Sequence, residues 1–324
     1  MQQKFMDMPA PDSLRIVSLL PSATEILDCL GLTPFVVGRS HECDYPADIS
    51  SQPICTAARL NSNRSSGEID RDVLALLQAA LGIYEVKLDV LRELKPTHIV
   101  TQAQCDVCAV TLKDVEQAIA TLDGEIKPQL ISLQPDTLAD VYADIIRVAQ
   151  VFKVDPQPAL TGLQNRVKSC GDRTKHLPTD QRPKVAAVEW IDPLMGGGNW
   201  LPELIEIAGG ENVLGQQGEH SPYISWETLL EKNPDIVVIM PCGFDLERTH
   251  QEMLADVTAH PQWRNLRAVK EDKLFICDGN AYFNRPGPRL IDSLEILAEI
   301  IHPNLFERQY TQQDWQRLKF PEIK

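Results

Sequence analysis

Short apolar runs alternate with helical patterns along the first part of the chain. The run Arg15–Leu20 ends at Pro21 and favours a buried strand, and the apolar spacing up to Gly31 predicts a helix capped by Ser22 or Thr24. Further strand-like runs lie at 36–37, 98–101 and 130–133, and helical segments lie at 89–94 and 112–122. Strands that alternate with helices predict a parallel sheet with covered faces.

The segment 137–170 has a helical pattern and contains no strand candidate. Its apolar residues recur at helical spacing, with one interruption near the prolines of Asp155–Pro158. We therefore expect one long helix within about 135–172 that joins two lobes.

The second half repeats the first in outline. A helix end, a proline and an apolar strand follow one another in 229–239, as they do in 91–100. Strand-like runs at 185–188 and 274–277 and helical segments at 202–208 and 288–301 complete the pattern. We predict an α/β fold of two parallel-sheet, Rossmann-like lobes, 13–134 and 183–310. The linking helix and connector occupy 135–182, and a ligand cleft lies between the lobes.

Charge and hydropathy exclude two classes of protein. The formal net charge is −15 and Lys and Arg are nowhere dense, so we expect no nucleic-acid partner. No run of 18 apolar residues exists, so no segment is expected to span a membrane. The first 22 residues show no secretory apolar region. As written the chain is expected to be cytoplasmic, or periplasmic if a signal segment has been removed.

The loops that follow the predicted strands carry the unusual side chains. Ligands of open parallel sheets bind beyond the carboxyl ends of the strands. Aromatic walls with a few polar anchors suit a large, flat, partly apolar ligand, and Gly196–Gly198 would let backbone approach it. The alternative is that the aromatic residues are core residues beneath the loops. The candidate ligand-binding residues are His41, Cys43, Tyr45, Gln102, Trp190, Trp200, Phe244, Tyr282, Phe283 and Arg285.

The eight cysteines leave a metal or redox role open. Cys105 and Cys108 form a CxxC pair, which His41 and Cys242 could complete as a metal site. The alternative, which the chain length favours, is free thiols that line a pocket or fill the core. Ser22 lacks the GxSxG context of a nucleophile, and no phosphate-binding glycine motif is present. We therefore predict that the protein is not an enzyme.

Several motifs together resemble a known family. RIVSLLPSATEILDCLG, VVGRSHECDYP, VLRELKPTHIV, AGGENVLG, SWETLLEKNPDIVVI and FNRPGPRLIDSLEILAE are similar, in order, to the cobalamin-binding proteins of ABC importers. The resemblance covers about 13–303 and belongs to a helix-linked class that also includes siderophore and haem binders. It implies that the protein holds a corrinoid for transport, storage or delivery. A haem or ferric siderophore ligand is the alternative, and a thiol- or metal-dependent enzyme is a third.

The resemblance also implies a partner. In the family, one acidic residue on each lobe docks onto arginines of the permease, and Asp89 and Glu227 stand at those motif positions. The segment from Ile54 to Gln78 is an insertion where better-known members carry a ligand-contacting Trp. We expect a monomer. His41 is a candidate axial ligand for cobalt, since imidazole binds cobalt well; otherwise it hydrogen-bonds a corrin amide or caps its own loop.

Overall fold

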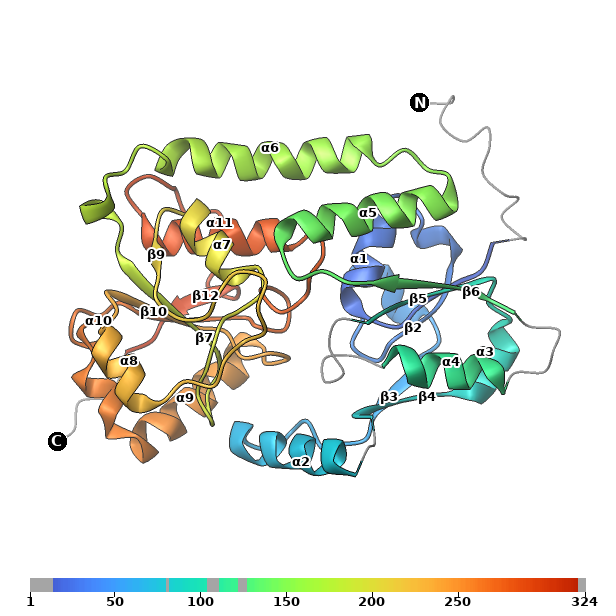
Figure 1. Ribbon diagram of the computed structural model, residues 1–324, viewed down its shortest axis with the longest axis horizontal. Helices are drawn as coiled ribbons and strands as arrows, with labels where there is room; N and C mark the ends of the chain where they lie inside the picture. The colour runs from blue at the N-terminus through green and yellow to red at the C-terminus, as the bar shows by residue number, and fades with distance from the viewer. Residues whose placement is uncertain (1–13, 80–81, 104–110, 122–126, 320–324) are drawn as a thin grey trace. The chain divides into compact units, whose positions relative to one another are not determined.

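The computed structural model describes residues 14–79, 82–103, 111–121 and 127–319 (Figure 1). The chain divides into two compact units. The N-terminal unit contains 1–64, 71–135 and 139–162, and the C-terminal unit contains 65–70, 136–138 and 163–324. Each unit has its own sheet and its own core.

A four-stranded parallel sheet forms the centre of the N-terminal unit. Its order is β2-β1-β5-β6, and every neighbouring pair is parallel. The strands are β1 (Ile16–Ser18), β2 (Val36–Arg39), β5 (His98–Gln102) and β6 (Gln129–Leu133). The apolar runs of the sequence thus become buried parallel strands, as predicted.

Helices cover both faces of this sheet (Figure 1). They are α1 (Pro21–Cys29), α3 (Leu88–Leu94) and α4 (Leu112–Ala120), with α5 (Leu138–Phe152) beside α1. Val17 and Ile99 pack with Leu91 of α3 and Val115 of α4 in one core cluster. This burial of branched apolar side chains stabilises the unit.

The start of α1 differs from the prediction. The N-cap is Leu20, with no side-chain cap, because Pro21 at the first helical position has the right φ and no donor to satisfy. Ser22 and Thr24 lie inside the helix, and the Thr24 hydroxyl instead donates to Ser18 Oγ at 2.8 Å.

The inserted segment contributes one strand and a helix, and its strand pairs with a short strand that follows the insertion. β3 (Thr56–Ala58) pairs with β4 (Tyr84–Val86), and α2 (Ser66–Gln78) lies between them in the chain. Two short 3-10 turns, η2 (Thr33–Phe35) and η3 (Ala47–Ser51), flank β2.

The stretch that was expected to be one long helix consists of two. α5 ends at Phe152, and α6 spans Gln157–Thr174. Lys153 has a φ of +54° and Pro156 cannot continue a helix, so the interruption falls where the prolines indicated.

A six-stranded sheet forms the centre of the C-terminal unit. Its path is β12-β11-β10-β7-β8, and β9 also pairs with β7. The strands are β7 (Lys184–Trp190), β8 (Met195–Gly196), β9 (Glu211–Asn212), β10 (Ile236–Ile239), β11 (Leu274–Cys277) and β12 (Trp315–Arg317). β9, β7, β10 and β11 are parallel, and only β8 and β12 run antiparallel to their partners.

The helices of this unit pack against the sheet through apolar side chains. They are α7 (Leu201–Ile207), α8 (Trp226–Lys232), α9 (Leu246–Ala259), α10 (Arg267–Lys270) and α11 (Leu290–Ile301), with 3-10 turns η4 (Thr179–Gln181) and η5 (Pro261–Asn265). Leu229 of α8 and Met253 of α9 join Trp263 in one core with the strands. α11 is buried along almost its whole length.

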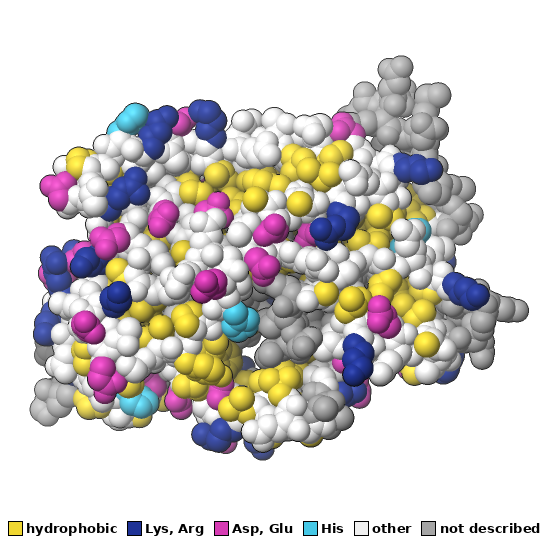
Figure 2. Space-filling model, viewed as in Figure 1, with side chains coloured by type: hydrophobic (Ala, Val, Ile, Leu, Met, Phe, Trp, Pro, Cys, Tyr) yellow, Lys and Arg dark blue, Asp and Glu magenta, His cyan; other side chains and the backbone are white. Residues whose placement is uncertain are grey.

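Charged side chains are spread over the surface. On the face drawn in Figure 2, Lys and Arg are scattered among Asp and Glu and form no continuous basic surface. Within the described ranges, no helix has the length and apolar character needed to cross a membrane.

Candidate ligand-binding site

A buried arginine holds the loop that follows β2. Arg39 is 9% exposed. Its guanidinium donates to the carbonyl oxygens of Ser40 and Cys43 at 3.1 and 3.0 Å and to that of Ser50 at 3.1 Å. Three charge-assisted hydrogen bonds from one side chain fix the path of the loop.

His41 is tied to the inserted segment. Its Nδ1 lies 2.7 Å from Thr56 Oγ1, and its backbone N–H donates to the same oxygen at 3.0 Å. The half-buried ring lies 5.5 Å from the Tyr84 ring, centroid to centroid. Burial, followed by the cations of Lys87 and Arg39, lowers the pKa of His41. The imidazole is therefore neutral at neutral pH.

The other predicted residues of this unit differ in exposure. Tyr45 is 43% exposed, whereas Cys43 and Gln102 are 1% and 3% exposed. The Cys43 Sγ lies 3.0 Å from the Thr24 hydroxyl oxygen. His41 and Tyr45 thus keep surface for a ligand, while Cys43 packs against α1 and belongs to the core.

Trp190 ends β7 in the C-terminal unit and is partly exposed. Its indole N–H donates to the Asp192 carbonyl at 3.1 Å, and its ring lies 5.2 Å from the Phe244 ring. The Arg248 guanidinium lies 3.6 Å from the Phe244 ring centroid. Trp190 is the more exposed member of this stack, and its ring packs against Phe244, which is 2% exposed.

Two further predicted aromatics are core residues. Trp200 is 6% exposed and Phe283 is fully buried. The Trp200 indole N–H donates to the Phe283 carbonyl at 2.7 Å, and the Phe283 N–H donates to Ser293 Oγ at 2.8 Å. The rings of Trp200, Phe244 and Phe283 are enclosed by protein, and the expectation that they wall a ligand stays a prediction. They hold the loops that carry other candidates.

Tyr282 and Arg285 belong to the loop that Phe283 anchors. Tyr282 is half-buried, and its hydroxyl donates to Asp314 Oδ1 at 2.9 Å. Burial and this carboxylate raise the pKa of Tyr282 to about 12. Arg285 is 7% exposed and donates to Asn280 Oδ1 at 3.0 Å. Tyr282 therefore retains some surface, and Arg285 braces the loop.

The glycine run serves the chain's own packing. A Cβ on Gly198 would lie 2.5 Å from the Glu219 carbonyl oxygen, and one on Gly197 would lie 2.5 Å from Leu201 Cδ1. The close approach expected for a ligand is in fact an approach of backbone to backbone and side chain within the unit.

The described cysteines do not assemble a metal site. Cys105 and Cys108 lie outside the described residues, and no three His, Cys, Asp or Glu side chains within those residues gather closely enough to hold a metal ion. Burial raises the pKa of Cys29, Cys55 and Cys170 to about 12. Such thiols are protonated and are poor metal ligands. Among the described cysteines, Cys29, Cys55, Cys170 and Cys277 are free thiols.

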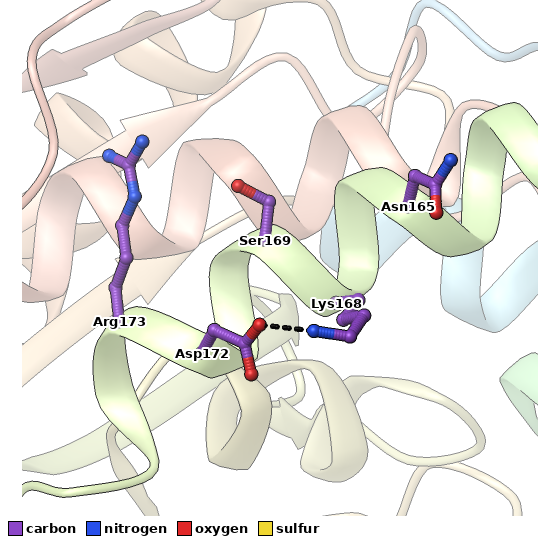
Figure 3. Close-up of a pocket in the computed structure, with 5 residues that line it drawn as sticks. All are labelled: Asn165, Lys168, Ser169, Asp172 and Arg173. Carbon is purple, nitrogen blue, oxygen red and sulfur yellow. Dashed lines mark hydrogen bonds and ion pairs between the residues drawn. The ribbon is translucent and has the colours of Figure 1, made fainter.

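A surface depression on α6 has no features of a ligand site. Asn165, Lys168, Ser169, Asp172 and Arg173 line it (Figure 3). Lys168 pairs with Asp172, and this pairing lowers the pKa of Asp172 to about 2. The depression is a solvated, ion-paired helix surface.

The two acidic residues assigned to partner docking are exposed. Asp89 lies in the first turn of α3 and Glu227 in the first turn of α8. The backbone N–H of Glu227 and the nearby Ser225 lower the pKa of Glu227, which is fully exposed. Both carboxylates are open to solvent for a cationic partner.

Sequence reasoning missed Arg39, Thr56 and Arg248. Arg39 and Thr56 act through contacts that only the fold creates, because Thr56 reaches His41 across 15 positions of chain. Arg248 belongs to α9, whose N-cap Asp245 accepts from the Arg248 backbone N–H. That Asp followed by helical spacing was the available signal.

Comparisons with known proteins agree with this fold. The chain is 22% identical to the uncharacterized ABC transporter substrate-binding lipoprotein YvrC of Bacillus subtilis, over 90% of this chain and 81% of that protein. It is 22% identical to a vitamin B12-binding protein of Vibrio parahaemolyticus, over 88% of each chain. A periplasmic heme-binding protein from Pseudomonas aeruginosa superposes with a TM-score of 0.68 at 19% identity, over 94% of this chain and 99% of that chain.

A family model described as periplasmic binding protein matches residues 16–281. This match includes the parallel strands of both units and most of the candidate loops. The chain therefore belongs to the periplasmic binding protein family.

Proposed function

We propose that this protein binds a corrinoid, cobalamin, and delivers it to an ABC importer. The observation that carries the proposal is the relationship to a protein named vitamin B12-binding protein over 88% of each chain. The periplasmic binding protein family model matches residues 16–281 of this chain. We infer a binding protein without catalytic activity.

Partly exposed aromatic side chains support a large planar ligand. Trp190 ends β7, and Tyr45 and Tyr282 stand on the loops that follow β2 and β11. These loops lie at the carboxyl ends of parallel strands, where ligands of such sheets bind. We propose His41 as a polar anchor and Trp190 as the principal apolar surface for the corrinoid.

Haem is the second candidate. The protein from Pseudomonas aeruginosa that shares this fold is a heme-binding protein. The neutral imidazole of His41 would suit iron as well as cobalt, since imidazole ligates both metals. Haem is also planar with apolar faces, so Trp190 would provide the same apolar contact surface for it.

We further propose that Asp89 and Glu227 dock onto cationic side chains of a membrane permease. Both carboxylates are exposed near helix starts on separate units. The relative from Bacillus subtilis is named an ABC transporter substrate-binding lipoprotein, which supports a role beside a transporter.

A panel of ligands tests the proposal. Purified protein is titrated with cyanocobalamin, ferric haem and a ferric siderophore, and tryptophan fluorescence reports binding through the five Trp residues. We expect the tightest binding for cyanocobalamin. Tighter binding of haem would select the second candidate, and tightest binding of the siderophore would overturn both.

A further inference from the structure

Two hydroxyl groups fix where the proton sits on His41. Thr56 Oγ1 donates to Ser40 Oγ at 3.1 Å, which uses its single hydrogen. Thr56 Oγ1 also lies 2.7 Å from Nδ1 of His41 and accepts from the His41 backbone N–H. A hydroxyl whose hydrogen is already donated can only accept further bonds. With Thr56 donating to Ser40, Nδ1 of His41 carries the proton and donates it to Thr56.

The surroundings hold this direction. Ser40 and Thr56 are 2% and 0% exposed, so water does not compete for these hydroxyls. Ser40 Oγ also lies 3.3 Å from the Glu42 backbone N–H, which donates to it. The His41 backbone N–H thus occupies one acceptor site of the Thr56 hydroxyl, and the Glu42 backbone N–H occupies one of the Ser40 hydroxyl. The hydrogen bonds therefore run from the imidazole to Thr56 and from Thr56 to Ser40.

The other ring nitrogen is left with its lone pair. A neutral imidazole protonated at Nδ1 is unprotonated at Nε2. Among the described residues no hydrogen bond to Nε2 is formed, whereas Nδ1 is bonded. Histidines that ligate metals show the same pattern, with one nitrogen on the metal and the other N–H donated to an oxygen.

We propose that Nε2 of His41 is the axial ligand of the metal in the bound tetrapyrrole, and that Thr56 is the positioning residue that prepares it. This inference rests on the function proposed above. The Nε2 lone pair forms the bond to the metal, and the water molecule on the metal leaves. The metal keeps its oxidation state, and no proton is released because Nε2 is already unprotonated. Corrinoid cobalt and haem iron with an exchangeable water share this chemistry.

The first arm of the test needs no ligand. Nitrogen NMR of protein with labelled histidine distinguishes the two tautomers, and a His41→Ala variant identifies the His41 signals among those of seven histidines. We expect the Nδ1–H tautomer in the wild type and in Thr56→Ser, which keeps the hydroxyl. In Thr56→Val the Nε2–H tautomer should gain population. Nε2–H as the main form in the wild type would overturn the inference.

The second arm uses absorbance spectra. Hydroxocobalamin in its water-bound form and ferric haem are the probes, and cyanocobalamin is the control because cyanide is not readily displaced. We expect a spectral shift on binding of a water-bound probe to the wild type and to Thr56→Ser, and none with His41→Ala. In Thr56→Val the affinity for that probe should fall about tenfold or more. Affinity for cyanocobalamin, read by tryptophan fluorescence, should change little in Thr56→Ser and Thr56→Val.

The outcomes separate the two proposals. Binding of the probes without a spectral shift, or a wild-type spectrum in His41→Ala, overturns the axial bond and leaves the proposed function standing. Failure of all three probes to bind overturns the proposed function and the axial bond together. The NMR arm still decides the tautomer in that case. If Thr56→Val does not fold, Thr56→Ser and His41→Ala decide the result.

Discussion

Asp89 and Glu227 occupy the same position in two equivalent elements. Each is the second residue of a seven-residue helix, α3 or α8. Each helix ends in a left-handed residue, Lys95 with φ +43° or Asn233 with φ +41°. A proline and a parallel strand follow in both. The repeat that the sequence indicated in outline therefore holds to the level of single residues at these two carboxylates.

This equivalence predicts a shared role in docking. Replacing both residues by Lys should slow association with a permease, because rim charges act mainly on association rate. Ligand affinity should stay unchanged, and association measured with permease in nanodiscs is the readout. The matched control is Glu93→Lys with Glu231→Lys, which reverses exposed charges on the same two helices. Equal loss of association in the control would contradict a role specific to Asp89 and Glu227.

Trp190 is predicted to contact the ligand directly. Trp190→Ala should weaken cyanocobalamin binding by about 1–3 kcal/mol, the usual effect of losing a large aromatic contact. The stability of the variant should change little, since the side chain is partly exposed. Fluorescence or calorimetric titration measures the affinity and thermal unfolding the stability. Unchanged affinity in a folded variant would place Trp190 outside the site.

Phe283 is predicted to act through stability. Its ring is fully buried, so Phe283→Ala should lower the free energy of unfolding by about 3–5 kcal/mol. Trp200→Phe removes one hydrogen bond to the Phe283 carbonyl and should cost about 1 kcal/mol. Urea unfolding measures both. A Phe283→Ala protein as stable as the wild type would show that the ring is not core.

Asp144 is predicted to make stability depend on pH. Burial raises its pKa to about 6 from an ordinary value near 3.8, although Arg147 opposes the shift. The folded state therefore holds the proton more tightly than the unfolded state, so the stabilisation is complete below about pH 4 and is lost as pH rises through 6. The stability of Asp144→Asn relative to the wild type should increase over this window. A difference that is constant between pH 4 and 7 would contradict the shift.

The strands were predictable from the sequence because their apolar runs are short and bounded by proline or glycine. Ile236–Ile239 and Leu274–Cys277 are examples. The β3-β4 pair was not predicted, since each of its strands has only three residues, and α2 was missed with it. β12 was also missed, because Trp315–Arg317 pairs with β11 from a distant part of the chain.

The candidate site was predictable only in its location. The loops after the strands were found, but the burial of each aromatic residue depends on neighbours distant in sequence. Phe283 has a φ of +65°, a conformation that its type does not suggest, and this turn places it among Ser293 and Trp200. The bond from His41 to Thr56 likewise requires the bridge between Arg39 and Ile54.

Calorimetric titration of the purified protein with cyanocobalamin tests the central claim most directly. The account predicts saturable binding of one corrinoid per chain, retained through gel filtration and weakened in Trp190→Ala. Absence of binding, in protein whose cooperative unfolding shows that it is folded, would contradict it.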